Sequence, residues 1–242
     1  MNSIGIIGGS GLYQLATDAK EIVVETPFGS VKLYETIVGK KTVFFLPRHG
    51  INHHLPPHKI NYRANIFALY HQRAQCILST AAVGSLNPSF EPGMFGYAGQ
   101  FIDFTKKRAD TFFDDFSNGI KHADMTNPYH PALNELLKRI LSDYFLPFLG
   151  PLTMVVTEGP RFESPAEIKA YQSFGADVVG MTGYPEVALA REMEIPFACL
   201  AISTNFAAGV SKEILSHEEV VEQMKHRSND LLRVITRFIE LV

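Results

Sequence analysis

The chain has few cysteines and no long apolar run, and both absences narrow the classes of protein it can belong to. Its 242 residues include two cysteines, Cys76 and Cys199, each inside a short apolar run. They predict buried strand residues and not a disulfide framework or a metal site. No apolar run approaches the roughly 20 residues that cross a bilayer. The N-terminal segment also lacks the basic region and apolar stretch of a secretory signal, so we expect a cytoplasmic protein.

Basic charge is not in excess either. The formal net charge is −3 at pH 7, with 22 lysines and arginines against 25 aspartates and glutamates. Proteins that bind DNA or RNA usually carry a basic patch, so the composition predicts no nucleic-acid partner. A small anionic substrate stays compatible with this composition, because local fields decide such binding. With 46% hydrophobic residues, the chain is long enough to bury a substantial core.

Short apolar runs bounded by glycine, proline or charge recur along the chain. Each is apolar throughout, which is typical of strands covered on both faces by helices. The six runs are Ile4–Ile7, Thr42–Leu46, Cys76–Thr80, Leu152–Val156, Asp177–Gly180 and Phe197–Ser203. Residues Glu21–Val24 and Val31–Val38 instead predict a peripheral hairpin around Pro27 and Gly29.

Helices are predicted between these strands. Their starts carry a proline in the first turn, or a serine followed three residues later by glutamate. The starts lie at Pro131, Ser164–Glu167, Pro185 and Ser216–Glu219. The alternation predicts one α/β domain over residues 1–242, with a mixed, mostly parallel central sheet flanked by helices. Asp103–Thr126 is polar and interrupted, and it predicts a long functional or interface loop.

A glycine-rich turn follows the first predicted strand. Gly8, Gly9 and Gly11 let the backbone approach a ligand closely, and their N–H groups with the Ser10 hydroxyl suit an anion. A glycine turn without a ligand is an equally good interpretation of these residues alone. A dinucleotide fingerprint is excluded, because it needs glycine or alanine at position 14, which is Gln14.

Arg48 and His49 follow directly after a predicted strand. Arg48 offers a planar charged fork suited to phosphate oxygens, and His49 adds a donor if it is protonated or suitably tautomerised. Such a pair alone would more often be a surface arginine and a loop histidine, but ligands of these sheets collect at strand ends. His53, His54 and His58 lack cysteine or acidic co-ligands, so we interpret them as solvated loop histidines and predict no metal.

Other strand ends carry groups suited to a flat polar ligand. Phe162 offers a ring for stacking, and Glu163 offers a carboxylate that only accepts hydrogen bonds. Asn205 adds a lone amide after the last strand. A core aromatic, a helix-start acid and a turn former are the alternative interpretations of these three residues. Ala82, Gly84, Met181 and Thr182 stand at two further strand ends.

Together these motifs resemble the family of trimeric purine nucleoside phosphorylases and methylthioadenosine phosphorylases. The matching segments occur in order from Ile4 to Gly209, nearly the whole chain. They read Ile-Gly-Ile-Ile-Gly-Gly-Ser-Gly-Leu, Pro-Arg-His-Gly, Asn-Tyr-Arg-Ala-Asn, Glu-Gly-Pro-Arg-Phe-Glu, Gly-Met-Thr-Gly-Tyr-Pro-Glu-Val-Ala-Leu-Ala-Arg-Glu and Ser-Thr-Asn-Phe-Ala-Ala-Gly. Within the family, the chain is most similar to the S-methyl-5′-thioinosine phosphorylases.

The resemblance implies a role for each matching residue. It assigns phosphate binding to Ser10, Arg48, His49, the backbone at Ala82, and Thr182. It assigns sugar and base contacts to Phe162, Met181, Gly84, Glu163 and Asn205, with Asn205 and His49 as the catalytic residues. It further implies inorganic phosphate as co-substrate, no cofactor and no metal, and a homotrimer or a dimer of trimers.

The chain departs from the adenine-preferring relatives at the base-reading positions. Those relatives carry Thr-Asp-x-Asp where this chain has residues Thr204 to Ala207, and they lack the glutamate at position 163. A 6-oxopurine presents an N1–H donor and an O6 acceptor, whereas a 6-aminopurine presents the reverse. Glu163 suits N1–H, and Asn205 can donate to O6 while it accepts from N7–H. Each buried mismatch costs about 1–3 kcal/mol, so we predict a preference for hypoxanthine or guanine.

The 5′ end of the nucleoside is less closely determined. His217 resembles a histidine that meets the 5′-hydroxyl in ordinary nucleoside phosphorylases, and it equally suits the first turn of the last helix. His122, in the long loop, is expected to reach a neighbouring subunit's site. The reaction implied is phosphorolysis of S-methyl-5′-thioinosine to hypoxanthine and 5-methylthioribose 1-phosphate, with inosine or guanosine as close alternatives. A methylthioadenosine phosphorylase, a hydrolytic nucleosidase, a nicotinamide-dependent oxidoreductase and a non-catalytic nucleoside-binding module are weaker alternatives.

Overall fold

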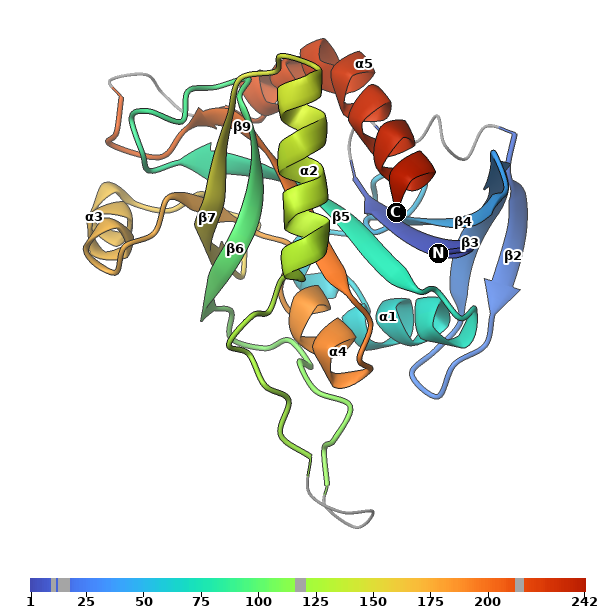
Figure 1. The fold of residues 1–242 in the computed structure, drawn as a ribbon. Coiled ribbons are helices and arrows are strands. Elements are labelled where there is room, and N and C mark those ends of the chain that lie inside the picture. The colour runs from blue at the N-terminus through green and yellow to red at the C-terminus, as the bar shows by residue number, and fades with distance from the viewer. Residues whose placement is uncertain (10–11, 13–17, 116–120, 212–215) are drawn as a thin grey trace.

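The computed structural model describes residues 1–242 with the exception of 10–11, 13–17, 116–120 and 212–215. Among the described residues, nine strands and five α-helices follow one another along the chain (Figure 1). The strands are β1 (Ser3–Gly8), β2 (Lys20–Val24), β3 (Val31–Val38), β4 (Lys41–Pro47), β5 (Cys76–Ser85), β6 (Phe95–Phe104), β7 (Phe148–Thr157), β8 (Val178–Gly180) and β9 (Phe197–Phe206). The helices are α1 (Tyr62–His71), α2 (Pro131–Asp143), α3 (Pro165–Ser173), α4 (Glu186–Glu192) and α5 (His217–Leu241), with a short 3-10 turn, η2, at Pro57–Lys59.

The strands form one mixed sheet in the order β2-β3-β4-β1-β5-β8-β7-β6-β9. β1 pairs in parallel with β4 and β5, and β5 pairs in parallel with β9. Because β9 also pairs with β6, the strands β5, β8, β7, β6 and β9 close into a ring. The β2–β3 hairpin is antiparallel and extends the sheet beyond β4. The predicted mixed α/β fold is confirmed.

Helices cover both faces of the sheet. Successive side chains along a strand point to opposite faces, so each central strand contributes residues to two cores. On one face, Ile7 and Ile77 belong to a core that includes residues of α1 and α4. On the other face, Ile6 and Leu78 belong to a core that includes residues of α2 and α5 (Figure 1). A smaller cluster joins α3 to β7 and β8. Burial on both faces explains why the central strands are apolar throughout.

Most predicted elements are present. Each of the six apolar runs forms or lies within a strand, except that β8 begins one residue later than predicted. Ser164 and Glu167 form the predicted capping box, in which the Ser164 N–H donates to Glu167 at 2.7 Å. The Ser216 hydroxyl accepts from the Glu219 N–H at 3.1 Å at the start of α5. No sequence pattern predicted β6 or α1, since glycines interrupt β6 and its outer half is exposed.

The long loop predicted at Asp103–Thr126 is confirmed from residue 105 onward, since β6 extends to Phe104. Residues 105–130 are called the long segment below; their described part contains neither helix nor strand, and it extends past α4 in Figure 1. The Thr111 hydroxyl and the Phe112 N–H donate to the carboxylate of Glu192 at 2.6 and 2.7 Å. These bonds hold the long segment against the C-terminal end of α4.

Both cysteines are free and buried, in β5 and β9, which confirms the prediction for them. No helix in the described ranges combines the length and the apolarity that spanning a bilayer requires. Within the same ranges, no three His, Cys, Asp or Glu side chains are grouped as metal ligands.

Candidate active site

A cavity of about 460 Å³ opens where several strands end. Residues directly after β1, β4 and β8 line it together with residues of β5 and β9, and the loop between β7 and α3 adds one wall. Helix α5 contributes Val220 and Met224. Nine predicted site residues meet in this cavity: Arg48, His49, Ala82, Gly84, Phe162, Glu163, Met181, Thr182 and Asn205. The predicted gathering of strand ends at one place is therefore confirmed, while the role of each residue stays a prediction.

Three predicted residues are not placed in this lining. Ser10 lies outside the described residues, although its neighbour Gly9 lines the cavity. His217 begins α5, one turn before Val220, and its side chain is outside the described part. His122 is exposed in the long segment and is not among the residues that line the cavity of this chain.

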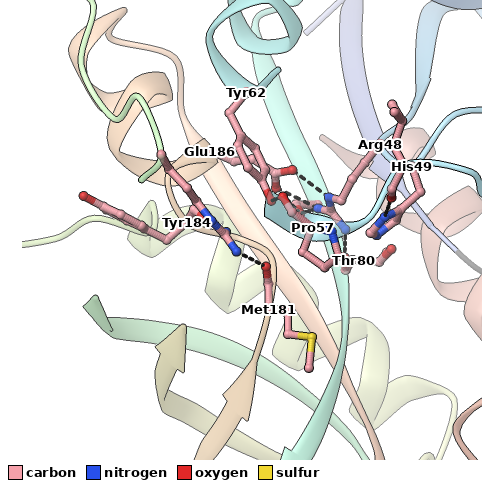
Figure 2. Close-up of polar contacts among 11 residues, drawn as sticks. Arg48, His49, Pro57, Tyr62, Thr80, Met181, Tyr184 and Glu186 are labelled. Atoms are coloured by element: carbon pink, nitrogen blue, oxygen red, sulfur yellow. Dashed lines mark hydrogen bonds and ion pairs between the residues drawn. The ribbon is translucent and has the colours of Figure 1, made fainter. Parts of the chain in front are cut away.

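Arg48 lies at the inner end of the cavity in a buried ion pair (Figure 2). Its Nε and Nη2 donate to the two carboxylate oxygens of Glu186 at 2.6 and 2.7 Å. Nη1 donates to the carbonyl of Thr80 at 2.7 Å, and Nη2 also donates to the hydroxyl of Ser79 at 2.5 Å. Arg48 and Glu186 are 3% and 1% exposed, so this pair is almost completely removed from water.

The ion pair limits what Arg48 can offer to an anion. A guanidinium has five N–H groups, and these four bonds leave one Nη1 N–H for a ligand. Burial acts to lower the pKa of Arg48, but the Glu186 carboxylate outweighs it and holds the pKa above its ordinary value. Arg48 is therefore a permanently charged single donor at this site, not the open fork that its sequence position suggested.

His49 faces the cavity as a neutral base. Its Nδ1 lies 2.8 Å from the carbonyl oxygen of Leu55, which can only accept, so Nδ1 carries the hydrogen. Burial, reinforced by the charge of Arg48, lowers the pKa of His49 to about 4. At neutral pH its Nε2 is therefore an acceptor, which suits a P–OH group. It is not the donor that a protonated ring or the other tautomer would provide.

We expect folding stability to fall by about 3 kcal/mol between pH 6.5 and pH 4 because of His49. The unfolded chain takes up a proton on this residue near pH 6.5, whereas the folded chain does so near pH 4. The stability that depends on a neutral His49 is fully present above pH 6.5, and it is lost as the pH falls from 6.5 to about 4. Urea denaturation at several pH values checks it. The His49→Gln variant should show a flatter profile, and identical slopes for the two proteins would contradict the assignment.

The opposite part of the cavity carries two side chains with defined acceptor and donor positions. One oxygen of Glu163 accepts from the Thr157 hydroxyl at 2.6 Å, which leaves the other oxygen for a ligand. Burial raises the pKa of Glu163, and the Thr157 hydroxyl acts in the opposite direction. Asn205 accepts from the Thr204 hydroxyl at 2.9 Å and donates to the carbonyl of Phe206 at 2.9 Å, so one amide N–H is left for a ligand.

Gly84 explains how Asn205 reaches its place. The two residues are partners in the β5–β9 pairing, directly after a register shift. A Cβ at position 84 would lie 3.3 Å from the Asn205 Nδ2 and 3.5 Å from Val179. Glycine therefore keeps the strand close to the amide, and a larger residue would push the amide out of position.

Sequence reasoning missed part of the site. The sequence motifs gave no role to Glu186, although it lies within the same motif as Met181 and Thr182. Its pairing with Arg48 joins residues 138 positions apart, which no local pattern signals. His53 and His54 are exposed as predicted, yet they line the cavity, and the His53 ring stacks on His49 at 4.4 Å between centroids.

Comparison with known families decides to which one this site belongs. The model of the family described as the phosphorylase superfamily matches residues 3–240. The chain belongs to the phosphorylase superfamily. The sequence motifs resemble purine nucleoside and methylthioadenosine phosphorylases, and this match confirms the resemblance at the level of the superfamily.

Relatives within the phosphorylase superfamily are similar over nearly their whole length. The chain is 47% identical to the 6-oxopurine nucleoside phosphorylase of Pyrococcus furiosus, covering 100% of this chain and 94% of the relative. It is also 47% identical to a probable S-methyl-5′-thioinosine phosphorylase of Methanocaldococcus jannaschii, covering 98% and 91%. The solved methylthioadenosine phosphorylase of Schistosoma mansoni in complex with adenine superposes with a TM-score of 0.93 at 31% identity, covering 100% and 92%.

Proposed function

We propose that the chain catalyses the phosphorolysis of 6-oxopurine nucleosides, in which inorganic phosphate replaces the base on the sugar. One observation supports this most: a single cavity holds Arg48, His49 and Thr182 together with Glu163 and Asn205. The first group suits an oxyanion, and the second suits the N1–H, O6 and N7 edge of a 6-oxopurine. The Pyrococcus furiosus and Methanocaldococcus jannaschii relatives are named for 6-oxopurine nucleosides and for S-methyl-5′-thioinosine, which supports the same substrate class.

The proposed chemistry follows from where charge develops. As the bond between C1′ and N9 stretches, the base takes up negative charge and the sugar becomes an oxocarbenium-like cation. The Asn205 amide donates to O6 and stabilises the charge of the departing base in the transition state, while Glu163 accepts from N1–H and orients the base. Phosphate at Arg48, His49 and Thr182 then forms the bond to C1′ from the other face. Alignment of both reactants removes much of the entropic barrier. The proposed reaction uses phosphate as co-substrate and needs no cofactor.

The 5′ substituent decides between two substrates within this class. The wall that α5 contributes consists, among the described residues, of the apolar side chains Val220 and Met224. A methylthio group loses no hydrogen bond on such a wall, whereas a 5′-hydroxyl would need a polar partner. We therefore propose S-methyl-5′-thioinosine as the preferred substrate, and inosine or guanosine as the second candidate that the name of the Pyrococcus furiosus relative favours.

Steady-state assays of five nucleosides with and without phosphate test this proposal. S-methyl-5′-thioinosine is expected to give the highest kcat/KM, followed by inosine and guanosine, with methylthioadenosine and adenosine far behind. Turnover should require phosphate and release a sugar 1-phosphate. Equal release of base without phosphate would identify a nucleosidase instead, and binding without turnover would identify a nucleoside-binding protein.

We expect Val220→Thr to lower kcat/KM for S-methyl-5′-thioinosine about 10-fold, because the added hydroxyl would face the methylthio group without a partner. The kcat/KM for inosine should stay within about threefold, since a 5′-hydroxyl can bond to threonine. Val221→Thr is the matched control, because Val221 is 47% exposed on the same helix. Equal losses on both substrates would contradict an apolar 5′ wall.

The resemblance of the sequence motifs to the trimeric nucleoside phosphorylases leads us to propose a homotrimer. We also propose a cytoplasmic location, because the sequence carries no pattern of a secretory signal. In that assembly, His122 of the exposed long segment would reach the cavity of a neighbouring subunit. Sedimentation velocity at assay concentration checks the subunit number.

A further inference from the structure

Arg108 is a buried arginine that none of the cavity-lining roles uses. It comes from the long segment between exposed neighbours, and its side chain is 1% exposed. Nη1 donates to the carbonyl of Tyr184 at 2.6 Å. Nη2 lies within hydrogen-bond distance of the carbonyls of Thr157, Glu158 and Met181, at 2.9, 3.0 and 2.9 Å. One guanidinium thus gathers four backbone carbonyls.

These carbonyls belong to two loops that carry the proposed ligand-binding residues. Thr157 ends β7, and Glu158 begins the loop after it, which continues to Phe162 and Glu163 at the base end of the cavity. Met181 and Tyr184 belong to the loop between β8 and α4. That second loop carries Thr182 of the proposed phosphate site and ends at Glu186, the partner of Arg48. Arg108 therefore binds the base-side loop and the phosphate-side loop at once.

The two loops also touch each other directly. Gly159 has φ +65°, and a Cβ there would lie 2.7 Å from the sulfur of Met181. The long segment is bonded to the same loops in return, since the Lys106 N–H donates to Glu158 at 2.6 Å and the Tyr184 hydroxyl donates to Asp110 at 2.7 Å. Among the hydrogen bonds between the described part of the long segment and these loops, only those of the Arg108 side chain reach both loops.

The guanidinium is placed by the ring of Tyr62. The Cζ of Arg108 lies 5.1 Å from the centroid of the Tyr62 ring, which is a cation–π contact. The Tyr62 hydroxyl donates to the carbonyl of Pro57, a residue of the cavity lining. Figure 2 shows Tyr62 and Glu186 between the Arg48–His49 pair and the Tyr184–Met181 loop. The nearest carboxylate oxygen, on Glu158, is 3.9 Å from Nε, so carbonyl dipoles and the Tyr62 ring carry most of the compensation for this charge.

We propose that Arg108 is a positioning residue for phosphorolysis, which holds the base-side and phosphate-side loops at the separation that in-line attack requires. This inference rests on the proposed function. Arg108 contacts neither substrate. It acts through the backbone of the loops that carry Glu163 and Thr182. Each loop binds its own ligand without Arg108, but the two reactants lose their mutual alignment. A displacement of about 1 Å between reacting groups can lower a rate about 100-fold.

The test compares Arg108→Ala with Arg63→Ala. Arg63 is the matched control, because it bonds to Asp114 of the same long segment and lies 4.8 Å from the Phe28 ring, and neither partner belongs to the two loops. Arg108→Ala is expected to lower kcat about 100-fold while the KM values and the Kd of hypoxanthine stay within about threefold. Added guanidinium at millimolar concentration should restore kcat at least 10-fold by filling the vacated space. Arg63→Ala should keep wild-type kcat.

Several outcomes would overturn this role. They are wild-type kcat in Arg108→Ala, parallel losses of kcat and hypoxanthine binding, and no response to guanidinium. If Arg108→Ala does not fold, Arg108→Lys decides, because one ammonium cannot span four carbonyls: a folded Lys variant with lowered kcat and intact hypoxanthine binding supports the proposal. A folded Lys variant with wild-type kcat, or failure of both variants to fold, overturns it.

A wild-type protein without phosphorolysis would overturn the proposed function itself, whereas an active wild type with an equally active Arg108→Ala overturns only the role of Arg108.

Discussion

Glu186→Ala is expected to destabilise the protein by about 3–5 kcal/mol, because it leaves the charge of Arg48 buried without a counter-ion. The pair is almost wholly inaccessible to water, and both carboxylate oxygens bond to the guanidinium. Water cannot replace the lost partner, so the desolvation cost of the arginine is no longer offset. Chemical denaturation at pH 7 measures the change.

Two comparison variants separate this effect from simple loss of a side chain. Glu240→Ala breaks an exposed pair with Arg237 and should cost less than about 1 kcal/mol. The double variant Glu186→Ala with Arg48→Met removes both charges and should recover much of the lost stability. A Glu186→Ala protein within about 1 kcal/mol of wild type would contradict the account of the buried pair.

Asn205→Asp is expected to lower the ratio of kcat/KM for inosine to that for adenosine by about 1000-fold. The Asn205 amide keeps one N–H for O6 of a 6-oxopurine, after its bonds to Thr204 and Phe206. Aspartate removes that donor and supplies an acceptor for a 6-amino group. Because inosine loses a bond that adenosine gains, the two effects add, each at about 1–3 kcal/mol.

Competition assays with both nucleosides in one mixture measure this ratio directly. Asn229→Asp makes the same charge change on the exposed face of α5 and should leave the ratio unchanged. An unchanged ratio in Asn205→Asp would contradict the role of Asn205 in base recognition. A loss of activity on both nucleosides without a change in their ratio would assign it to catalysis alone.

Much of the candidate site was predictable because its residues follow buried strands. Apolar runs mark the strands, and the parallel strands β4 and β9 bring Arg48 and Asn205 to the same edge of the sheet. Thr182 reaches the same place although β8 runs antiparallel to β5, which the sequence pattern does not predict. The cavity contains all three. Arg108 was not predictable as a cavity-supporting residue, since it lies in a polar segment without periodicity. Only the folded backbone shows that four carbonyls converge on it.

The amino-acid sequence by itself determined the mixed α/β fold, the capped helix starts and the group of side chains that meet at the strand ends. These features follow from local patterns of apolar residues, glycine and proline. Only the tertiary structure decided that Arg48 keeps a single N–H for a ligand and that His49 is a neutral acceptor. The reason is physical: donor capacity and pKa depend on which atoms lie within a few ångströms and on how much water reaches them, and distant chain segments such as Glu186 supply those atoms.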